Sequence, residues 1–327
     1  MEPEAETARD RLERAILGEE RIFNALEVAE ETGLTIDQLR RLWRALGFPE
    51  HGFEVAFTRA DAEAVSRLNG IVDTGVIDFD TAVNLTRAVG QTLARLADWE
   101  VGTLTHRVEE LERGEEATGS RSGSALRMLR EINPPFESLL VYVWRRHLAA
   151  AVARIEELGA NEEDLHTAHV TVGFADLVGF TALSNQVGRA RIGEIVELFE
   201  SRCADVVAGR RGRVIKSLGD SVLFVNDDPI RAYDTAEGII NVVGRDPRMP
   251  DVRVGLASGS VVMRLGDVFG PPVNMADRMT AVARRNRIVV DAETAGLLPA
   301  DQFESRVLPA RPVRGFGLVE PVAVRRH

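Results

Sequence analysis

The chain has 327 residues, a net charge of −11 at pH 7 and a hydrophobic fraction of 45%. This length suggests two domains of ordinary size, and this composition excludes global disorder because it can supply packed cores. The acidic balance is the opposite of that in a protein that coats nucleic acid, although a local site can still be positive and bind phosphate.

Three features predict a cytoplasmic protein without a membrane span. Cys203 is the only cysteine, so no intrachain disulfide can form and a reducing compartment fits. The N-terminus, MEPEAETARD, is acidic and polar, which is unlike a secretion signal. The longest apolar runs, such as LLVYVW from Leu139, fall far short of the roughly 20 residues that a spanning helix needs.

Residues 1–158 predict an all-α domain. Strong helix formers dominate, and apolar residues recur three and four positions apart, as in Leu39, Leu42, Trp43 and Leu46. We expect a second helical stretch over 58–111, a small polar loop over 114–124, and further helix over 125–158 that the Pro134-Pro135 pair interrupts.

The segment 21–48 resembles a helix-turn-helix of the type found in MerR-like regulators, with Thr35 as the N-cap of its second helix. DNA binding is disfavoured because the first 50 residues carry twelve acids against seven arginines, whereas a surface that follows phosphates is basic. A helical module for protein contact or regulation is the favoured interpretation, and nucleic acid is an unlikely partner.

The helix expected over 136–158 is apolar on more than one face, so something must cover it, and a partner subunit is one candidate. A linker is expected over 159–168. From His169 to the C-terminus, strand-like runs alternate with helical ones in the order βαββαβ. This order predicts a ferredoxin-like core with additions over 169–327, and hence an α+β chain.

The first motif is FADLVGFTALS, in which Asp176 ends an apolar strand and precedes Gly179 and a helix. A carboxylate in this position can hold Mg²⁺ while the helix amides face a phosphate. Taken alone, such an aspartate is more often an N-cap or a solvated loop residue.

The second motif is IKSLGDSVLF, which places Asp220 at the tip of a hairpin. Asp220 would lie next to Asp176 if the two strands are neighbours in the sheet. Lys216 stands four residues earlier, on the strand. The plain alternatives are an ordinary Gly-Asp turn and an exposed edge lysine.

The third motif is GDVFGPPVNMADR. Asn274 and Arg278 are four residues apart on a predicted helix, and therefore share a face that could bind sugar and phosphate oxygens. Asp267 precedes this helix in a glycine-containing turn. A capping asparagine, a surface arginine and a turn aspartate are the alternatives.

Together and in this order, the three motifs resemble the catalytic domain of class III nucleotidyl cyclases over about Ala168 to Val324. The resemblance implies that Asp176 and Asp220 hold two Mg²⁺ or Mn²⁺ ions and that Lys216 and Asp267 read the adenine ring of ATP.

The same resemblance assigns the ribose to Asn274 and the transition-state charge to Arg278. It also assigns the triphosphate to Arg314 in VRGFG, by a looser match. In this family each site lies between two catalytic domains, so a chain with all six motif residues and one such domain implies a homodimer.

The complete layout resembles soluble actinobacterial adenylyl cyclases with an N-terminal helical regulatory domain, here 1–158. The resemblance implies that ATP is converted to 3′,5′-cyclic AMP and pyrophosphate, and that the connecting helix controls the catalytic dimer, often by autoinhibition. The regulatory ligand or condition is open. The alternatives are a guanylyl cyclase, which Lys216 and Asp267 disfavour, and a DNA-binding regulator with a cyclase-like sensor domain.

Overall fold

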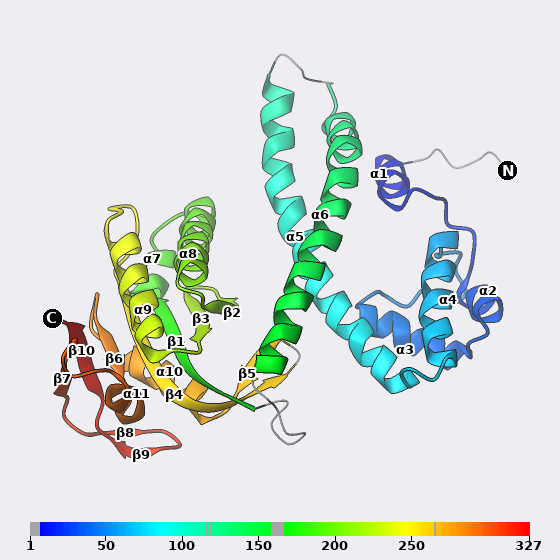
Figure 1. The fold of residues 1–327 in the computed structure, drawn as a ribbon. Helices are drawn as coiled ribbons and strands as arrows, with labels where there is room; N and C mark the ends of the chain where they lie inside the picture. Colours follow the sequence, from blue (N-terminus) through cyan, green and yellow to red (C-terminus); the bar gives the residue numbers. More distant parts are fainter. Residues whose placement is uncertain (1–6, 115–116, 118, 158–166, 265) are drawn as a thin grey trace. The chain divides into compact units, whose positions relative to one another are not determined.

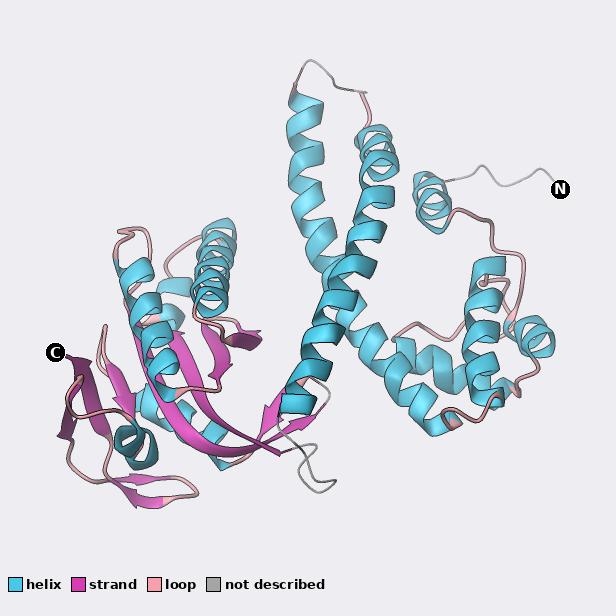
Figure 2. Cartoon of the chain, viewed as in Figure 1, coloured by secondary structure: helices cyan, strands magenta, loops and turns pink. Residues whose placement is uncertain are grey.

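The computed structural model describes residues 7–114, 117, 119–157, 167–264 and 266–327. The chain divides into two compact units, Met1–Ala153 and Arg154–His327, which we describe separately (Figure 1). Helices make up the first unit, and the second contains a sheet with helices packed on it (Figure 2). The predicted division into an all-α half and an α+β half is confirmed.

The first unit begins with four short helices, α1 (Ala8–Leu17), α2 (Ala25–Thr32), α3 (Ile36–Leu46) and α4 (Arg59–Asp73). The turn between α2 and α3 has the predicted form, because the Thr35 side chain accepts a hydrogen bond from the Gln38 amide at the start of α3. Buried apolar side chains of α2, α3 and α4 form one core, which includes Leu39, Leu42 and Trp43.

Two long helices follow, α5 (Phe79–Arg113) and α6 (Arg121–Glu157). The predicted break at Pro134-Pro135 is wrong, because α6 continues through both prolines. The prolines remove the donors for the carbonyl groups of Arg130 and Glu131, and both residues are exposed, so water can satisfy these groups. No helix in the described part of the chain is long and apolar enough to cross a membrane.

The core of the second unit is an antiparallel arrangement of β1 (Thr167–Leu177), β2 (Arg213–Leu218), β3 (Ser221–Asn226) and β4 (Val252–Arg264) in the order β2-β3-β1-β4. The predicted βαββαβ order is confirmed, since helices connect β1 to β2 and β3 to β4. β1 begins two residues before the expected His169, and residues 159–166 of the expected linker lie outside the described residues.

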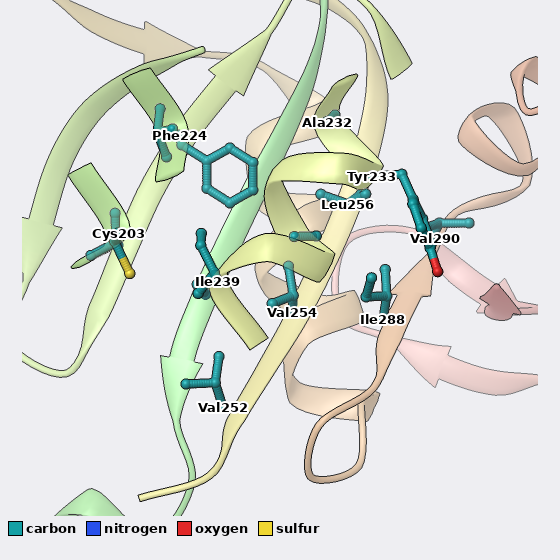
Figure 3. Close-up of a cluster of buried hydrophobic side chains, with 14 of the residues drawn as sticks. Cys203, Phe224, Ala232, Tyr233, Ile239, Val252, Val254, Leu256, Ile288 and Val290 are labelled. Carbon is teal, nitrogen blue, oxygen red and sulfur yellow. The ribbon is translucent and has the colours of Figure 1, made fainter. Parts of the chain in front are cut away.

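Helices cover both faces of this sheet. α8 (Arg189–Gly209) and α9 (Pro229–Gly244) pack on one face, where the largest buried cluster includes side chains of α9 and of β4 and β6 (Figure 3). α10 (Pro271–Val282) packs on the other face, over β1 and β4. The helical segment between β1 and β2 has two parts, α7 (Phe180–Ser184) and α8, which begins after Gly188.

The remaining elements follow β4 in the chain, and four of their strands join the main sheet. They are β5 (Asp267–Phe269), β6 (Ile288–Val290), α11 (Ala292–Leu297), β7 (Phe303–Val307), β8 (Arg311–Val313), β9 (Gly317–Val319) and β10 (Val322–Arg326). β6, β10 and β7 continue the main sheet beyond β4, while β8 and β9 form a separate hairpin. β7 was not predicted, because only its first residue, Phe303, is buried and the strand therefore lacks an alternating pattern.

Candidate active site

The centre of the candidate site is Asp176, close to the end of the central strand β1. The strand register places it between Ser221 of β3 and Arg253 of β4. The Ser221 hydroxyl donates to Oδ1 of Asp176 at 2.5 Å, and Nε of Arg253 donates to Oδ2 at 2.7 Å. Neighbouring strands on both sides therefore fix the orientation of this carboxylate.

Asp220 lies beside Asp176, as the hairpin position predicted. It follows Gly219, whose φ of 69° is the left-handed conformation that the tight turn between β2 and β3 requires. The Asp220 carbonyl accepts a hydrogen bond from the Leu177 amide at 2.9 Å, which attaches the hairpin tip to the end of β1. Burial raises the pKa of the Asp220 carboxyl group, and the negative charge of Asp176 raises it further.

Burial and the nearby charge of Asp176 both disfavour a negative charge on Asp220 unless a cation compensates it. Two carboxylates on adjacent strand ends supply the oxygen ligands that Mg²⁺ or Mn²⁺ prefers. Among the described residues, no group of three or more His, Cys, Asp or Glu side chains could hold a metal ion. The donor set therefore fits a metal that takes its remaining ligands from carbonyl groups, water and substrate phosphates.

Arg253 is a member of this cluster that the motifs did not reveal. Nε and Nη2 of its guanidinium each lie 2.7 Å from Oδ2 of Asp176, and its side chain is one-third exposed. The sequence carried one signal: Arg253 is a charged residue between the apolar Val252 and Val254 of a buried strand. A charge in this setting requires a partner, but only the strand pairing identifies Asp176 as that partner.

Lys216 and Asp267 form a second pair. Lys216 belongs to β2 and Asp267 begins β5, and Nζ of the lysine lies 2.5 Å from Oδ2 of the aspartate. The other carboxylate oxygen accepts a hydrogen bond from the Val268 amide at 2.8 Å. Both side chains remain about one-third exposed, so the pair is fixed in position while its polar edge is accessible to a ligand.

Asn274 and Arg278 lie one turn apart on α10 and are both exposed. Gly255 of β4 allows α10 to approach the sheet, because a Cβ atom there would lie 2.2 Å from the Thr280 amide nitrogen. Nη1 of Arg278 lies 3.3 Å from a carboxylate oxygen of Asp277. The helix therefore presents an amide and a guanidinium to the surroundings from a rigid support.

Arg314 follows β8 and is exposed. No hydrogen bond or ion pair among the described residues joins it to the other candidate residues. The hydrogen bonds and ion pairs described above divide the six motif residues into three groups. These are the carboxylates with Arg253, the Lys216–Asp267 pair, and the two side chains of α10. Each of the first two groups is held together by contacts of its own, but no described contact joins one group to another.

Known proteins similar to this chain cover both units. Residues 163–323 match the family described as Adenylate and Guanylate cyclase catalytic domain, and residues 5–136 match the family described as Adenylate cyclase regulatory domain. An adenylate cyclase of Streptomyces coelicolor is 37% identical over 344 residues, which cover 97% of this chain and 89% of that protein. An adenylate cyclase of Streptomyces griseus is 35% identical over 367 residues, covering 100% of this chain and 91% of that protein.

Among solved structures, the crystal structure of the adenylyl cyclase CyaB from P. aeruginosa matches with a TM-score of 0.44 and 19% identity, over 49% of this chain and 94% of that one. On the strength of the full-length relatives, the chain belongs to the family of nucleotidyl cyclases in which an adenylate cyclase regulatory domain precedes an adenylate and guanylate cyclase catalytic domain. The enzyme class that the three motifs predicted is confirmed.

Proposed function

We propose that this protein is an adenylyl cyclase that converts ATP to 3′,5′-cyclic AMP and pyrophosphate in a homodimer. The observation that carries the proposal is that both pairs are intact: side chains of β3 and β4 orient the Asp176 carboxylate beside Asp220, and Lys216 binds Asp267. The two Streptomyces relatives are both adenylate cyclases, which supports the same activity.

Asp176 and Asp220 are the residues that would hold Mg²⁺ or Mn²⁺. Bound there, two such ions would lower the pKa of the ribose 3′ hydroxyl and neutralise the triphosphate. The reaction is an in-line displacement in which the 3′ oxygen bonds to the α-phosphorus and the bond to the leaving pyrophosphate breaks. Arg253 would bind a phosphate oxygen here, because Nε and Nη2 face Asp176 while the two N–H groups of Nη1 remain for other partners.

Lys216 and Asp267 would select the purine. Adenine presents an amino donor, which matches the Asp267 carboxylate, and the ring acceptor N1, which matches the Lys216 ammonium group. Guanine presents O6 and N1–H in the corresponding positions, so each protein group would meet the wrong partner. The ion pair between the two side chains supports the assignment, because it holds both in place before the base arrives.

Like Lys216 and Asp267, Asn274 and Arg278 would act in the site that contains the carboxylates of the opposite subunit. Asn274 would orient the ribose, and Arg278 would donate hydrogen bonds to oxygens of the α-phosphate as negative charge develops on them. A symmetric dimer would bring α10 of one subunit to the carboxylates of the other and thus form two equivalent sites. Because no described contact joins the three groups within one chain, such a dimer is a way to unite them.

We further propose that residues 1–158 regulate the catalytic domain, 169–327, through α6. The match of residues 5–136 to an adenylate cyclase regulatory domain supports this assignment. α6 also extends to Glu157, a few residues before the catalytic strand β1, so a shift of the helix would change how two catalytic domains meet.

The test is a turnover assay of the full-length protein with ATP and with GTP, each with Mg²⁺ and with Mn²⁺. We expect cyclic AMP from ATP, dependence on the metal, and a kcat/KM for GTP that is lower by about two orders of magnitude or more. Preferred turnover of GTP would overturn the purine assignment, and the absence of any cyclic nucleotide would overturn the proposed activity.

A further inference from the structure

A basic hollow of about 520 Å³ lies next to the carboxylate pair, on the catalytic unit. Its six lining residues are Val178, Arg253, Ala283, Arg284, Arg285 and Arg287, so four of the six are arginines. The chain as a whole carries a net charge of −11, so this concentration of positive charge is local. A local field of this kind selects anions even on an acidic protein.

The turn that follows α10, residues 284–287, is held rigidly in place. Asn286 has a φ of 54°, and its amide donates to the Val252 carbonyl at 2.7 Å. Its side chain also accepts from the Val252 amide at 3.2 Å and donates to the Asp251 carboxylate at 2.7 Å. The Arg287 carbonyl accepts from the Val254 amide at 3.1 Å. The three arginines of the turn are therefore kept close together despite their mutual repulsion.

Few acidic groups compensate these charges. Arg285 lies 3.7 Å from Asp251, and Arg287 donates to a backbone carbonyl at 3.2 Å. No side-chain hydrogen bond or ion pair of Arg284 is found among the described residues, and both Arg284 and Arg285 are exposed. A fixed cluster with spare guanidinium donors fits an anion with several oxygens.

The hollow adjoins the place where phosphates would react. Val178 follows the end of β1 two residues after Asp176, and its amide donates to the Asp251 carbonyl at 2.8 Å. Arg253 lines the hollow and also contacts Asp176. The segment Asp251–Val254 thus links the end of β1 to the arginine turn. An anion in the hollow would share Arg253 with Asp176.

We propose that Arg284, Arg285 and Arg287 form, with Arg253, a binding site for the β- and γ-phosphates of the nucleotide, and hence for the pyrophosphate that leaves. This inference rests on the proposed cyclase activity. It assigns a role to the turn after α10, which none of the three motifs contains. The ligand class is an inorganic or nucleotide-linked diphosphate, whose two phosphoryl groups can engage several guanidinium groups at once.

The test compares full-length wild-type protein with the double variant Arg284→Gln, Arg285→Gln. Pyrophosphate binding is measured by calorimetry with Mg²⁺, and the KM for ATP by turnover. We expect pyrophosphate to bind about 10- to 100-fold more weakly to the variant, and the KM for ATP to rise, since charge-assisted hydrogen bonds are lost. The difference should shrink at high salt.

Two further variants serve as controls. Arg210→Gln, Arg211→Gln removes the same charge from two exposed neighbours outside the hollow, and should leave pyrophosphate binding unchanged. Arg284→Lys, Arg285→Lys keeps the charge and should retain most of the binding. Thermal unfolding of each variant checks that the fold is kept.

The possible outcomes separate the inference from the proposed activity. If the wild type makes cyclic AMP but the Arg284→Gln, Arg285→Gln variant binds pyrophosphate as the wild type does, the arginine turn has no role and only this inference fails. An equal loss in the Arg210→Gln, Arg211→Gln variant would also overturn it, because the effect would then be one of net charge. If the wild type makes no cyclic nucleotide, the proposed activity fails, and pyrophosphate binding still reports on the hollow.

Discussion

The two units of this chain differ in what they leave exposed. The catalytic unit buries apolar clusters on both faces of its sheet, exposes polar groups such as Asn274 and Arg278, and leaves single apolar side chains such as Phe269 exposed. The first unit buries an apolar core in α2–α4, but its long helices leave aromatic side chains exposed, including Trp99 at 59% and Trp144 at 60%. The described contacts of the catalytic unit do not join its three groups of motif residues, and the long helices keep large apolar side chains exposed.

One arrangement would complete both units. A second copy of the chain could bring α10 to the carboxylates, and it could also cover the apolar stripe of α6. This stripe consists of side chains three or four positions apart, each about half exposed: Val141, Trp144, Leu148 and Val152. The contrast between the units therefore leads to predictions about chemistry in one unit and about association in the other.

The largest expected effect is on the catalytic unit. Replacing Asp176 by Asn should lower kcat by about 1,000-fold, equivalent to about 4 kcal/mol of barrier, since a neutral amide is a poor metal ligand. Asp205→Asn, an exposed change on α8, is the matched control and should keep full activity. An Asp176→Asn variant that retains a tenth of the wild-type rate would contradict the metal assignment.

The same variant can test whether the site is shared between subunits. Arg278→Gln should also be nearly inactive, but mixing it with Asp176→Asn should restore about a quarter of the wild-type activity. Half of the randomly formed dimers would be mixed, and each of these would carry one intact site of its two. Activity is measured after mixing and subunit exchange. If exchange is demonstrated and activity stays at the level of the single variants, each site is built within one chain.

A smaller effect is expected on the choice between ATP and GTP. Lys216→Glu should lower kcat/KM for ATP by about 100-fold, because the donor to adenine N1 is replaced by a carboxylate next to Asp267. The value for GTP should fall less, since the introduced carboxylate accepts from guanine N1–H, so the ratio of ATP to GTP turnover should drop. Lys216→Gln, which keeps a donor, should retain more ATP turnover. A parallel fall for both nucleotides would show that Lys216 does not read the base.

The three predictions above concern the catalytic unit, where the sequence correctly placed several candidate site residues on turns and strand ends. The position of Asp220 beside Asp176 followed from two local facts, a Gly-Asp hairpin tip and an apolar strand end. The role of Arg253 could not be predicted in this way, because its contact with Asp176 depends on which strands are neighbours across 77 positions of sequence. Local patterns predict turns and strands, whereas a pairing between distant strands is decided by the packing of the whole sheet.

The helical unit shows the opposite difficulty. Pro134-Pro135 predicted a break in α6 because each proline removes a donor, yet the helix continues where the affected carbonyl groups belong to exposed residues. The cost of a proline depends on whether water can reach the freed carbonyl group. That accessibility is a property of the folded surface and is not visible in the local sequence.

A smaller effect is expected on the first unit. Trp144→Glu places a charge in the apolar stripe of α6, and should weaken dimerisation of the full-length protein by about 30-fold, the loss that a buried tryptophan at the centre of an interface typically causes. The cyclase rate at low protein concentration should change with it. Analytical ultracentrifugation measures the first quantity. Arg146→Gln changes an exposed residue outside the stripe and serves as the control; equal dimer affinity in all three proteins would remove α6 from the interface.

The smallest expected effect is on the thermal stability of the catalytic unit, to which the hydrogen bonds of Asp246 contribute. Asp246 joins α8 to the loop before β4, because it accepts hydrogen bonds from Arg202 at 2.6 Å and from Arg248 at 2.7 Å. The hydrogen bonds from the Arg248 side chain and amide, with a further contribution from Arg202, hold the pKa of the Asp246 carboxyl group well below its usual range. Asp246→Asn should lower the midpoint of thermal unfolding by a few degrees at neutral pH.

The pH dependence of this difference has a definite sign. A carboxyl group whose pKa is depressed in the folded state stabilises the fold fully above its unfolded pKa of about 3.9, and loses this contribution as pH falls toward the folded value. The gap between wild type and Asp246→Asn should therefore be largest near neutral pH and should narrow below about pH 4. Asp227→Asn, an exposed change with the same loss of charge, should show little difference at any pH. A gap that stays constant down to strongly acidic pH would mean that Asp246 acts through packing and not through its charge.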